Sequence, residues 1–170
     1  MKDTECPIRT VDHKPVNVKQ YRFPKNLEDE VTKQVEKLLK QGIIKHSISP
    51  YNSPLWMVPT KPDAQGNKKW RMVVDFRQLN LKTIPDKFPL PNIRSGLAKL
   101  GGSKIFTTLD LASGFHQIPM KRSDQEKTAF STHNNHYEYT HMPFGLRNAG
   151  PIFQRCMHQL LGNIVGRGGP

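Results

Sequence analysis

The sequence is poor in cysteine, in long hydrophobic runs and in acidic residues. Only two of its 170 residues are cysteines, Cys6 and Cys156, and their separation fits neither a CxxC metal motif nor a disulfide framework. No apolar run approaches the ~18 residues that a membrane span requires, and the N-terminus lacks the apolar core of a secretory signal. These absences predict an intracellular protein with reduced thiols, not a secreted or membrane protein.

The shortage of acidic residues leaves a large positive charge. The chain has 26 Lys and Arg against 14 Asp and Glu, a formal net charge of +12. Residues 41–104 hold 11 of the basic and 3 of the acidic side chains, which gives this segment +8. Because Lys and Arg displace counterions from phosphates, such a segment favours a nucleic-acid partner. A solvated basic surface without a partner is the alternative.

Hydrophobic periodicity predicts a mixed α+β chain. We expect a helix from Asn26, as its N-cap, to Gly42, followed by a hairpin of strands 55–61 and 68–76 that places Arg71 on its polar face. The other expected elements are an amphipathic segment at 93–100, a buried strand at 105–110, a capping box at 123–126, a strand pair at 128–132 and 137–141, and a helix at 151–161 with an apolar side formed by Phe153, Met157, Leu160 and Leu161.

The two ends differ from this central region in composition. Residues 1–20 mix charges with proline and carry few large apolar side chains, which is typical of a leader or linker. Residues 162–170 contain four glycines, so we expect a frayed tail. The folded domain is therefore expected between residues 21 and 161.

One segment combines an apolar strand pattern with a carboxylate and a turn of small residues. It reads LDLASGFHQ from Leu109, and Asp110 follows the predicted strand. A carboxylate at such a position is suited to binding a hard cation. For a lone acid, a cap or turn role is the alternative.

Nine motifs, spread in order over about residues 20–161, resemble the reverse transcriptase of gypsy-type LTR retrotransposons, a relative of retroviral polymerases. They are YRFP from Tyr21, GII from Gly42, SPLW from Ser53, WRMVVDFRQLN from Trp70, FPLP from Phe88, TLDLASGFHQ from Thr108, KTAF from Lys127, MPFGLRNA from Met142 and FQR from Phe153. The resemblance implies the fingers and partial palm of a right-hand polymerase fold, truncated, at 21–161. Residues 1–20 resemble the junction between protease and polymerase in such polyproteins.

The resemblance also implies a chemistry. In this family two Mg²⁺ ions promote attack of a primer 3′-hydroxyl on the α-phosphate of a deoxynucleoside triphosphate. Asp110 matches the first catalytic metal ligand, and the Leu111 carbonyl matches an auxiliary ligand. The implied partners are an RNA or DNA template with its primer and the remainder of the Pol polyprotein. The implied location is a cytoplasmic virus-like particle.

Nucleotide contacts follow from the same motifs. Arg71 matches the fingers arginine that grips the incoming triphosphate, with Lys68 or Lys69 assisting, and a surface arginine is the alternative. Phe115 matches the bulky residue that excludes a ribose 2′-hydroxyl, and plain core packing is the alternative. Phe144 is implied to line the nucleotide pocket.

Template contacts are implied for three further residues. Gly145 matches the loop beside the nucleotide and template, and Arg77 and Asn80 match positions near the template strand. The rest of the family's catalytic set has no match, because its Tyr- or Phe-x-Asp-Asp hairpin needs an Asp-Asp dipeptide and the sequence contains none. One carboxylate is a poor cage for two divalent ions, so we expect the chain to be inactive by itself.

Two other interpretations remain open from the sequence. One is a nucleic-acid-binding remnant of such an element without catalysis, which only a primer-extension assay separates from the enzyme. The other is a structural zinc protein, although the spacings of its candidate ligands match no known zinc pattern. These candidates are His133, His136, His141, Cys156 and His158.

Overall fold

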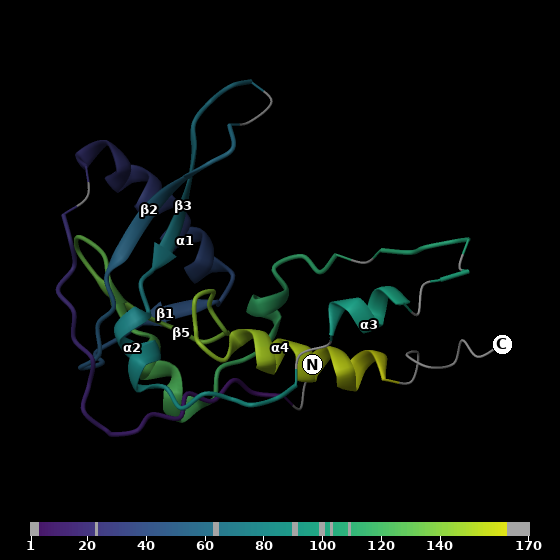
Figure 1. Cartoon of the computed structure of the whole chain (residues 1–170). Helices are drawn as coiled ribbons and strands as arrows, with labels where there is room; N and C mark the ends of the chain where they lie inside the picture. The colour runs from purple at the N-terminus through teal and green to yellow at the C-terminus, as the bar shows by residue number, and fades with distance from the viewer. Residues whose placement is uncertain are drawn as a thin grey trace.

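The computed structural model describes residues 4–22, 24–62, 65–89, 92–98, 101–102, 104–108 and 110–162, and these form an α+β fold (Figure 1). The α-helices are α1 (Glu28–Lys40), α2 (Arg77–Lys82), α3 (Ile93–Ala98) and α4 (Ala149–Leu161). The strands are β1 (Ile44–His46), β2 (Leu55–Thr60), β3 (Lys69–Val74), β4 (Phe130–Ser131) and β5 (His136–Tyr139). Three 3₁₀ helices are η1 (Lys25–Leu27), η2 (Gly114–Gln117) and η3 (Arg122–Thr128). No helix in these ranges is long and apolar enough to cross a membrane.

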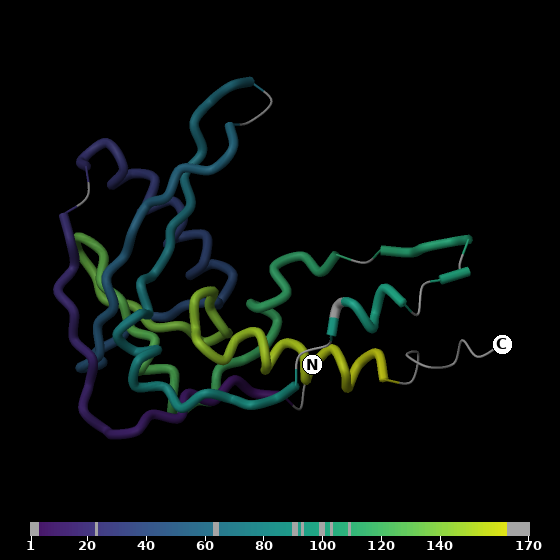
Figure 2. The backbone as a smooth tube through the Cα atoms, viewed as in Figure 1, coloured from purple at the N-terminus to yellow at the C-terminus, as the bar shows by residue number. Residues whose placement is uncertain are grey.

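The predicted first hairpin is confirmed. β2 and β3 pair antiparallel, from Leu55 opposite Val74 at the base to Thr60 opposite Lys69 near the tip. The two base residues are buried, whereas the outer part is partly or fully exposed, and in Figures 1 and 2 the hairpin projects from the body of the fold. The buried part of the hairpin is therefore its base.

A second, three-stranded sheet lies at the base of this hairpin. Its order is β1-β5-β4 and both pairings are antiparallel, so the predicted second strand pair is confirmed with shorter strands. Tyr139 of β5 stacks on Phe130 of β4, with ring centroids 5.4 Å apart, and meets the edge of Phe76, which follows β3, at 6.4 Å. This aromatic cluster joins the hairpin to the sheet, and burial raises the pKa of Tyr139.

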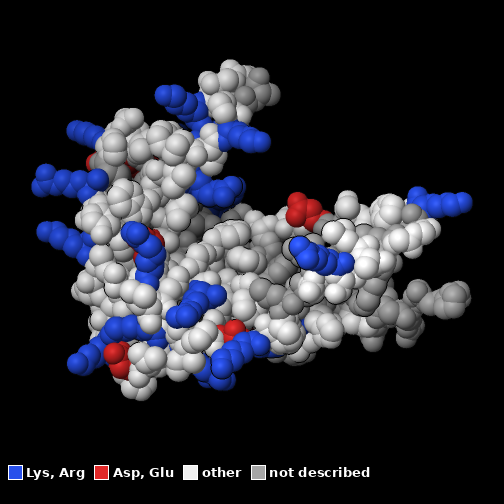
Figure 3. All heavy atoms as spheres, viewed as in Figure 1, with Lys and Arg blue, Asp and Glu red and all other residues white. Residues whose placement is uncertain are grey.

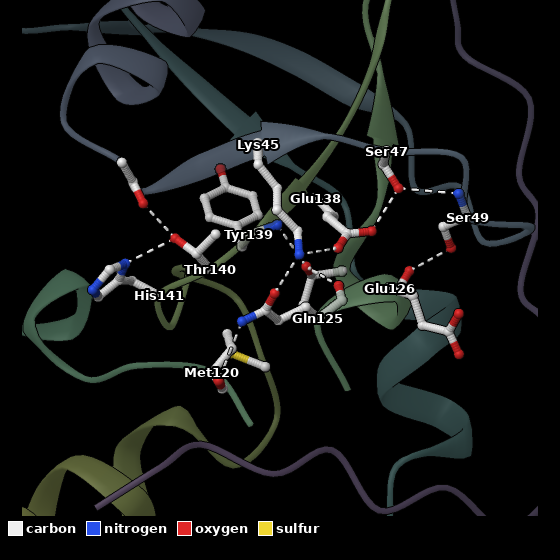
Figure 4. Close-up of polar contacts among 12 residues, drawn as sticks. Lys45, Ser47, Ser49, Met120, Gln125, Glu126, Glu138, Tyr139, Thr140 and His141 are labelled. Carbon is white, nitrogen blue, oxygen red and sulfur yellow. Dashed lines mark hydrogen bonds and ion pairs between the residues drawn. The ribbon is translucent and has the colours of Figure 1, made fainter. Parts of the chain in front are cut away.

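Polar contacts hold β1, β5 and η3 together (Figure 4). The buried Glu138 carboxylate pairs with the Lys45 ammonium at 3.1 Å and accepts a 2.6 Å hydrogen bond from the Ser47 hydroxyl. Lys45 also donates to the Gln125 side chain at 2.7 Å, which ties β1 to η3. Because a buried carboxylate without partners would be strongly destabilising, these bonds fix the sheet's position.

Both predicted N-terminal helix caps are wrong. Asn26 lies inside η1, because the Leu27 N–H bonds the Pro24 carbonyl at 2.9 Å, and α1 begins at Glu28 with no side-chain cap. The capping box at 123–126 does not form either, because η3 already begins at Arg122, which puts Ser123 inside the helix, and it has no side-chain cap. The predicted end of the first helix is confirmed, since Gly42 adopts a φ of 69°.

Residues 4–20 are packed onto the domain, whereas their composition predicts a leader or linker. The Cys6 N–H and carbonyl pair with the backbone of residues 119 and 121, at 2.8 and 2.9 Å. Asp124 accepts a hydrogen bond from the Ile8 N–H at 3.1 Å, and Lys127 donates to the Ile8 carbonyl at 2.7 Å. Their junction with a protease stays a prediction.

Both cysteines are buried free thiols of the same core. Burial raises the pKa of Cys6 to about 12, which keeps the thiol protonated.

Two apolar segments, residues 104–108 and α4, differ in structure or burial from the prediction. Residues 104–108 form no strand, and Ile105 and Phe106 are 88% and 61% exposed, because no described strand lies beside them to pair with. In α4 the buried residues are Ala149, Ile152 and Cys156, while the predicted apolar side is only half-buried near its start and exposed at Leu160 and Leu161. The predicted tail lies outside the described residues from position 163 onward.

The buried Lys127–Asp124 pair generates a stability prediction. Its atoms are 2.7 Å apart, and both side chains are almost fully enclosed. Lys127→Met leaves a buried carboxylate and the Ile8 carbonyl without their partner, so the free energy of unfolding should fall by about 3 kcal/mol in urea titrations. The control is Lys82→Met, which removes a more exposed pair with Asp12 and should change stability far less. Equal losses of unfolding free energy in the two variants would contradict the conclusion that the contacts of residues 4–10 with η3 stabilise the fold.

Candidate active site

A cavity of about 690 Å³ lies between α1, β3 and the loop that follows β5. Its lining includes, from α1, Glu30, Lys33, Gln34 and Lys37; from β3, Arg71, Met72 and Val73; and from later segments Ser113, His116, Tyr139 and Phe144. Figure 3 shows Lys and Arg side chains projecting from the upper and left parts of the face in view. The cavity thus brings together Arg71 and Phe144, which the sequence predicts to contact the same nucleotide.

The basic side of the cavity comes from two elements. Arg71 is exposed on β3, and Lys33 and Lys37 are exposed one helical turn apart on α1. The positive charge suits a polyanion such as a triphosphate. Sequence reasoning missed the two α1 lysines, because exposed lysines on a helix are common and only the packing of α1 beside β3 places them here. Lys68 and Lys69 are exposed but are not among the lining residues.

Phe115 packs in an aromatic row behind the cavity. Its ring centroid lies 5.0 Å from that of Phe144 and 5.2 Å from that of Phe153 in α4. The preceding turn needs small residues, because a Cβ at Gly114 would lie 2.9 Å from the Phe153 ring and Ser113 adopts a left-handed φ of 50°. Phe115 is half-buried and packs against the core, and it is not itself among the residues that line the cavity.

Asn80 holds the loop that carries Phe144. Its amide nitrogen donates to the Gly145 carbonyl at 2.7 Å, and its amide oxygen accepts from the Arg147 N–H at 2.8 Å. Gly145 adopts a φ of 90°, a conformation that favours glycine. Asn80 is therefore a positioning residue in this structure, and a direct contact with a template stays a prediction.

Arg77 is engaged by its neighbour Asp75. The guanidinium bonds both carboxylate oxygens, the closest at 2.6 Å, and lowers the pKa of Asp75. The Arg77 side chain is nevertheless 80% exposed, so its outer face is accessible.

An exposed aromatic pair, Tyr21 and Trp56, has ring centroids 5.1 Å apart. Trp56 borders a shallow groove with Val73 and Arg77. Sequence reasoning noted the SPLW motif that contains Trp56 but assigned the tryptophan no role. Its exposure is what identifies it as a candidate contact for bases.

Asp110 is exposed and is not among the described residues that line the cavity, although Ser113, three positions further on, is one of them. The Leu111 carbonyl, the predicted auxiliary ligand, accepts a hydrogen bond from the Gly114 N–H at 3.2 Å, which leaves it one free lone pair. Within the described part of the chain no three His, Cys, Asp or Glu side chains gather to hold a metal ion. These residues alone therefore do not fit a two-metal centre.

Histidines near the site are engaged in packing and local hydrogen bonds. Burial, together with the nearby His141, lowers the pKa of His116, so its ring is neutral at neutral pH. His141 accepts or donates a 2.9 Å bond with Thr140, which also bonds the Gly42 carbonyl (Figure 4). Of the zinc candidates, His136 uses both ring nitrogens on neighbouring oxygens and Cys156 is a core residue.

Comparisons with known proteins identify the family to which the chain is similar. Residues 59–167 match the model of the family described as reverse transcriptase (RNA-dependent DNA polymerase). The Pol polyprotein of the Drosophila melanogaster transposon opus is 54% identical over 163 residues, which are 96% of this chain and 16% of that polyprotein. The polyprotein of the transposon gypsy is 52% identical over 161 residues, 94% of this chain and 16% of its own length. The chain thus spans about a sixth of these relatives.

Solved structures give the same fold. Native prototype foamy virus protease–reverse transcriptase aligns with a TM-score of 0.81 and 30% identity over 95% of this chain and 21% of that one. The foamy viral enzyme in complex with an RNA/DNA hybrid aligns with a TM-score of 0.77 and 26% identity, over 96% of this chain and 21% of that one. The fingers and partial palm implied by the sequence are confirmed, and the chain belongs to the reverse transcriptase family.

Proposed function

We propose that this chain supplies the fingers and part of the palm of an RNA-directed DNA polymerase that adds deoxynucleotides to a primer 3′-hydroxyl. One observation carries the proposal: in a member of the reverse transcriptase family, Arg71 and Phe144 line one basic cavity, with Phe115 packed against Phe144. The cavity is large enough for a nucleotide, and its charge opposes that of a triphosphate.

The roles within the cavity follow from charge and shape. The Arg71 guanidinium can bond two phosphate oxygens at once, and Lys33 and Lys37 add positive charge on the facing helix. Phe115, fixed between Phe144 and Phe153, presents a rigid surface to the sugar. A rigid ring at this position leaves no space for a ribose 2′-hydroxyl.

Asp110 would contribute one ligand to a pair of Mg²⁺ ions, with the Leu111 carbonyl as an auxiliary ligand. When bound, the ions would activate the primer hydroxyl and neutralise the triphosphate. Because the described residues supply this carboxylate alone, the other ligands must come from groups outside them. We propose that these belong to the remainder of a Pol polyprotein in a cytoplasmic virus-like particle.

Template and primer would lie along the other basic and aromatic surfaces. Tyr21 and Trp56 offer exposed rings for unpaired template bases, and Arg77 offers a guanidinium to the adjacent phosphate. Asn80 would act through the Gly145 loop. Foamy viral relatives have been solved in complex with double-stranded DNA and with an RNA/DNA hybrid, which supports these partners.

A binding module without catalysis is the second candidate, and the exposed, isolated Asp110 favours it. Primer extension on an RNA template with a DNA primer separates the two candidates. Both predict binding that weakens steeply as salt rises, and the polymerase alone extends the primer.

Arg71→Ala tests the triphosphate contact. A charge-assisted hydrogen bond contributes about 1.5–3 kcal/mol, so the Kd of the chain for Mg²⁺-dTTP should rise about tenfold or more in calorimetric titrations. Affinity for an RNA/DNA primer-template should change by less than about twofold. Arg122→Ala, at an exposed arginine of η3, is the control. An unchanged Kd for dTTP in Arg71→Ala would exclude this role for Arg71.

Phe115→Val tests sugar discrimination. The ratio of the Kd values for UTP and dTTP should fall by about threefold or more, because the smaller side chain opens space for the 2′-hydroxyl. The matched variant Phe106→Val, at an exposed phenylalanine, should leave the ratio unchanged. An unaltered ratio in Phe115→Val would mean that Phe115 serves only packing.

Asp110→Asn tests the metal ligand. In a Pol polyprotein carrying this sequence, the substitution should reduce primer extension at least about a hundredfold, since a neutral amide oxygen binds Mg²⁺ much more weakly than a carboxylate does. Duplex binding should stay nearly intact, and Asp29→Asn in α1 should leave extension unchanged. Retained extension in Asp110→Asn would refute the assignment.

A further inference from the structure

Within the part of the chain that the structure describes, β3 has one edge without a strand partner. Its sheet there consists of β2 and β3, so β3 pairs with β2 on one side and faces α1 on the other. The Trp70 carbonyl and the Met72 N–H bond α1 rather than β2, and these two groups flank Arg71 along the chain. Unsatisfied groups at such an edge favour fraying or unwanted pairing.

A single side chain of α1 satisfies both groups. The Gln34 amide nitrogen donates to the Trp70 carbonyl at 2.9 Å, and its amide oxygen accepts from the Met72 N–H at 2.9 Å. The same nitrogen donates its second hydrogen to the Glu30 carboxylate at 2.7 Å, which fixes the orientation of the amide. Gln34 therefore pairs with β3 as a neighbouring strand would.

We propose that Gln34 is a positioning residue for nucleotide binding, which acts by holding the backbone on both sides of Arg71. This inference rests on the proposed role of Arg71 as the triphosphate contact. A two-stranded ribbon is only marginally stable by itself, and the outer part of this one is partly or fully exposed. Gln34 supplies a second anchor at Arg71, beside the cavity that both residues line.

The geometry explains why a small change here matters. A guanidinium that forms two hydrogen bonds to a phosphate requires its Cα to be placed to within a fraction of an ångström. Without the Gln34 bonds the Arg71 backbone can shift with the outer part of the hairpin. Nucleotide affinity is then lost although Arg71 itself is unchanged.

The test is a double-mutant cycle on the full chain, with Mg²⁺-dTTP as the ligand. Gln34→Met keeps the length of the side chain and removes its hydrogen bonds. We expect it to raise the Kd for dTTP about fivefold, since misplacing a binding group by a fraction of an ångström weakens its contacts. In the Arg71→Ala background the same substitution should have no further effect, because Gln34 acts through Arg71.

The control is Gln159→Met, at an exposed glutamine of α4 that does not line the cavity and whose side chain accepts a hydrogen bond from the Thr4 hydroxyl at 3.0 Å. It should change the Kd by less than twofold in either background. Amide hydrogen exchange at Met72 should speed up in Gln34→Met and not in Gln159→Met. Binding of an RNA/DNA primer-template and the midpoint of thermal unfolding should stay close to those of the unmodified chain in both variants.

Three results would overturn the inference. An unchanged dTTP affinity in Gln34→Met, together with a loss in Arg71→Ala, would reject Gln34 and leave the proposed function standing. Equal losses for Gln34→Met in both backgrounds, or a parallel fall in duplex binding and thermal stability, would show that it acts on the fold and not through Arg71. An unchanged affinity in Arg71→Ala would overturn the role of Arg71 and the Gln34 inference together.

Discussion

The buried contact of Phe76, Phe130 and Tyr139 is the constraint on which the site depends. Phe76 lies just beyond the end of β3, the second strand of the hairpin. The other two rings belong to the three-stranded sheet. All three rings are almost fully buried, so the hairpin base cannot move without opening the core. This junction places Arg71 on one side of the cavity and the Phe144 loop on the other.

Beyond this junction, side-chain amides position the active-site backbone. Asn80 ties the Phe144–Gly145 loop to α2, and Gln34 ties β3 to α1. In each case one amide satisfies both a backbone donor and a backbone acceptor. Such paired bonds align two segments in direction as well as distance, which a single bond cannot do. The residues expected to touch substrate are thus held mainly by residues that do not.

The elements predicted correctly from the sequence are those whose pattern lies within their own residues. The β2–β3 hairpin and α4 follow from alternation and helical spacing, and the nine family motifs identify Arg71, Phe115 and Phe144 as site residues. Gln34 could not be found in this way, because its partners lie 36 and 38 residues away. The segment 105–108 has the composition of a buried strand, but a strand forms only beside a partner, and none is present among the described residues. The predicted caps failed because a 3₁₀ helix begins before each of them and takes Asn26 or Ser123 into its interior.

The central claim is that Arg71, Ser113 and Phe144 form one nucleotide-binding surface. It is tested most directly by recording ¹H–¹⁵N spectra of the chain while Mg²⁺-dTTP is added. The largest shift changes should occur at the amides of these three residues and at those of Lys33 and Lys37. Changes concentrated on the basic surface of η3 and residues 4–14, with the cavity residues unmoved, would contradict it.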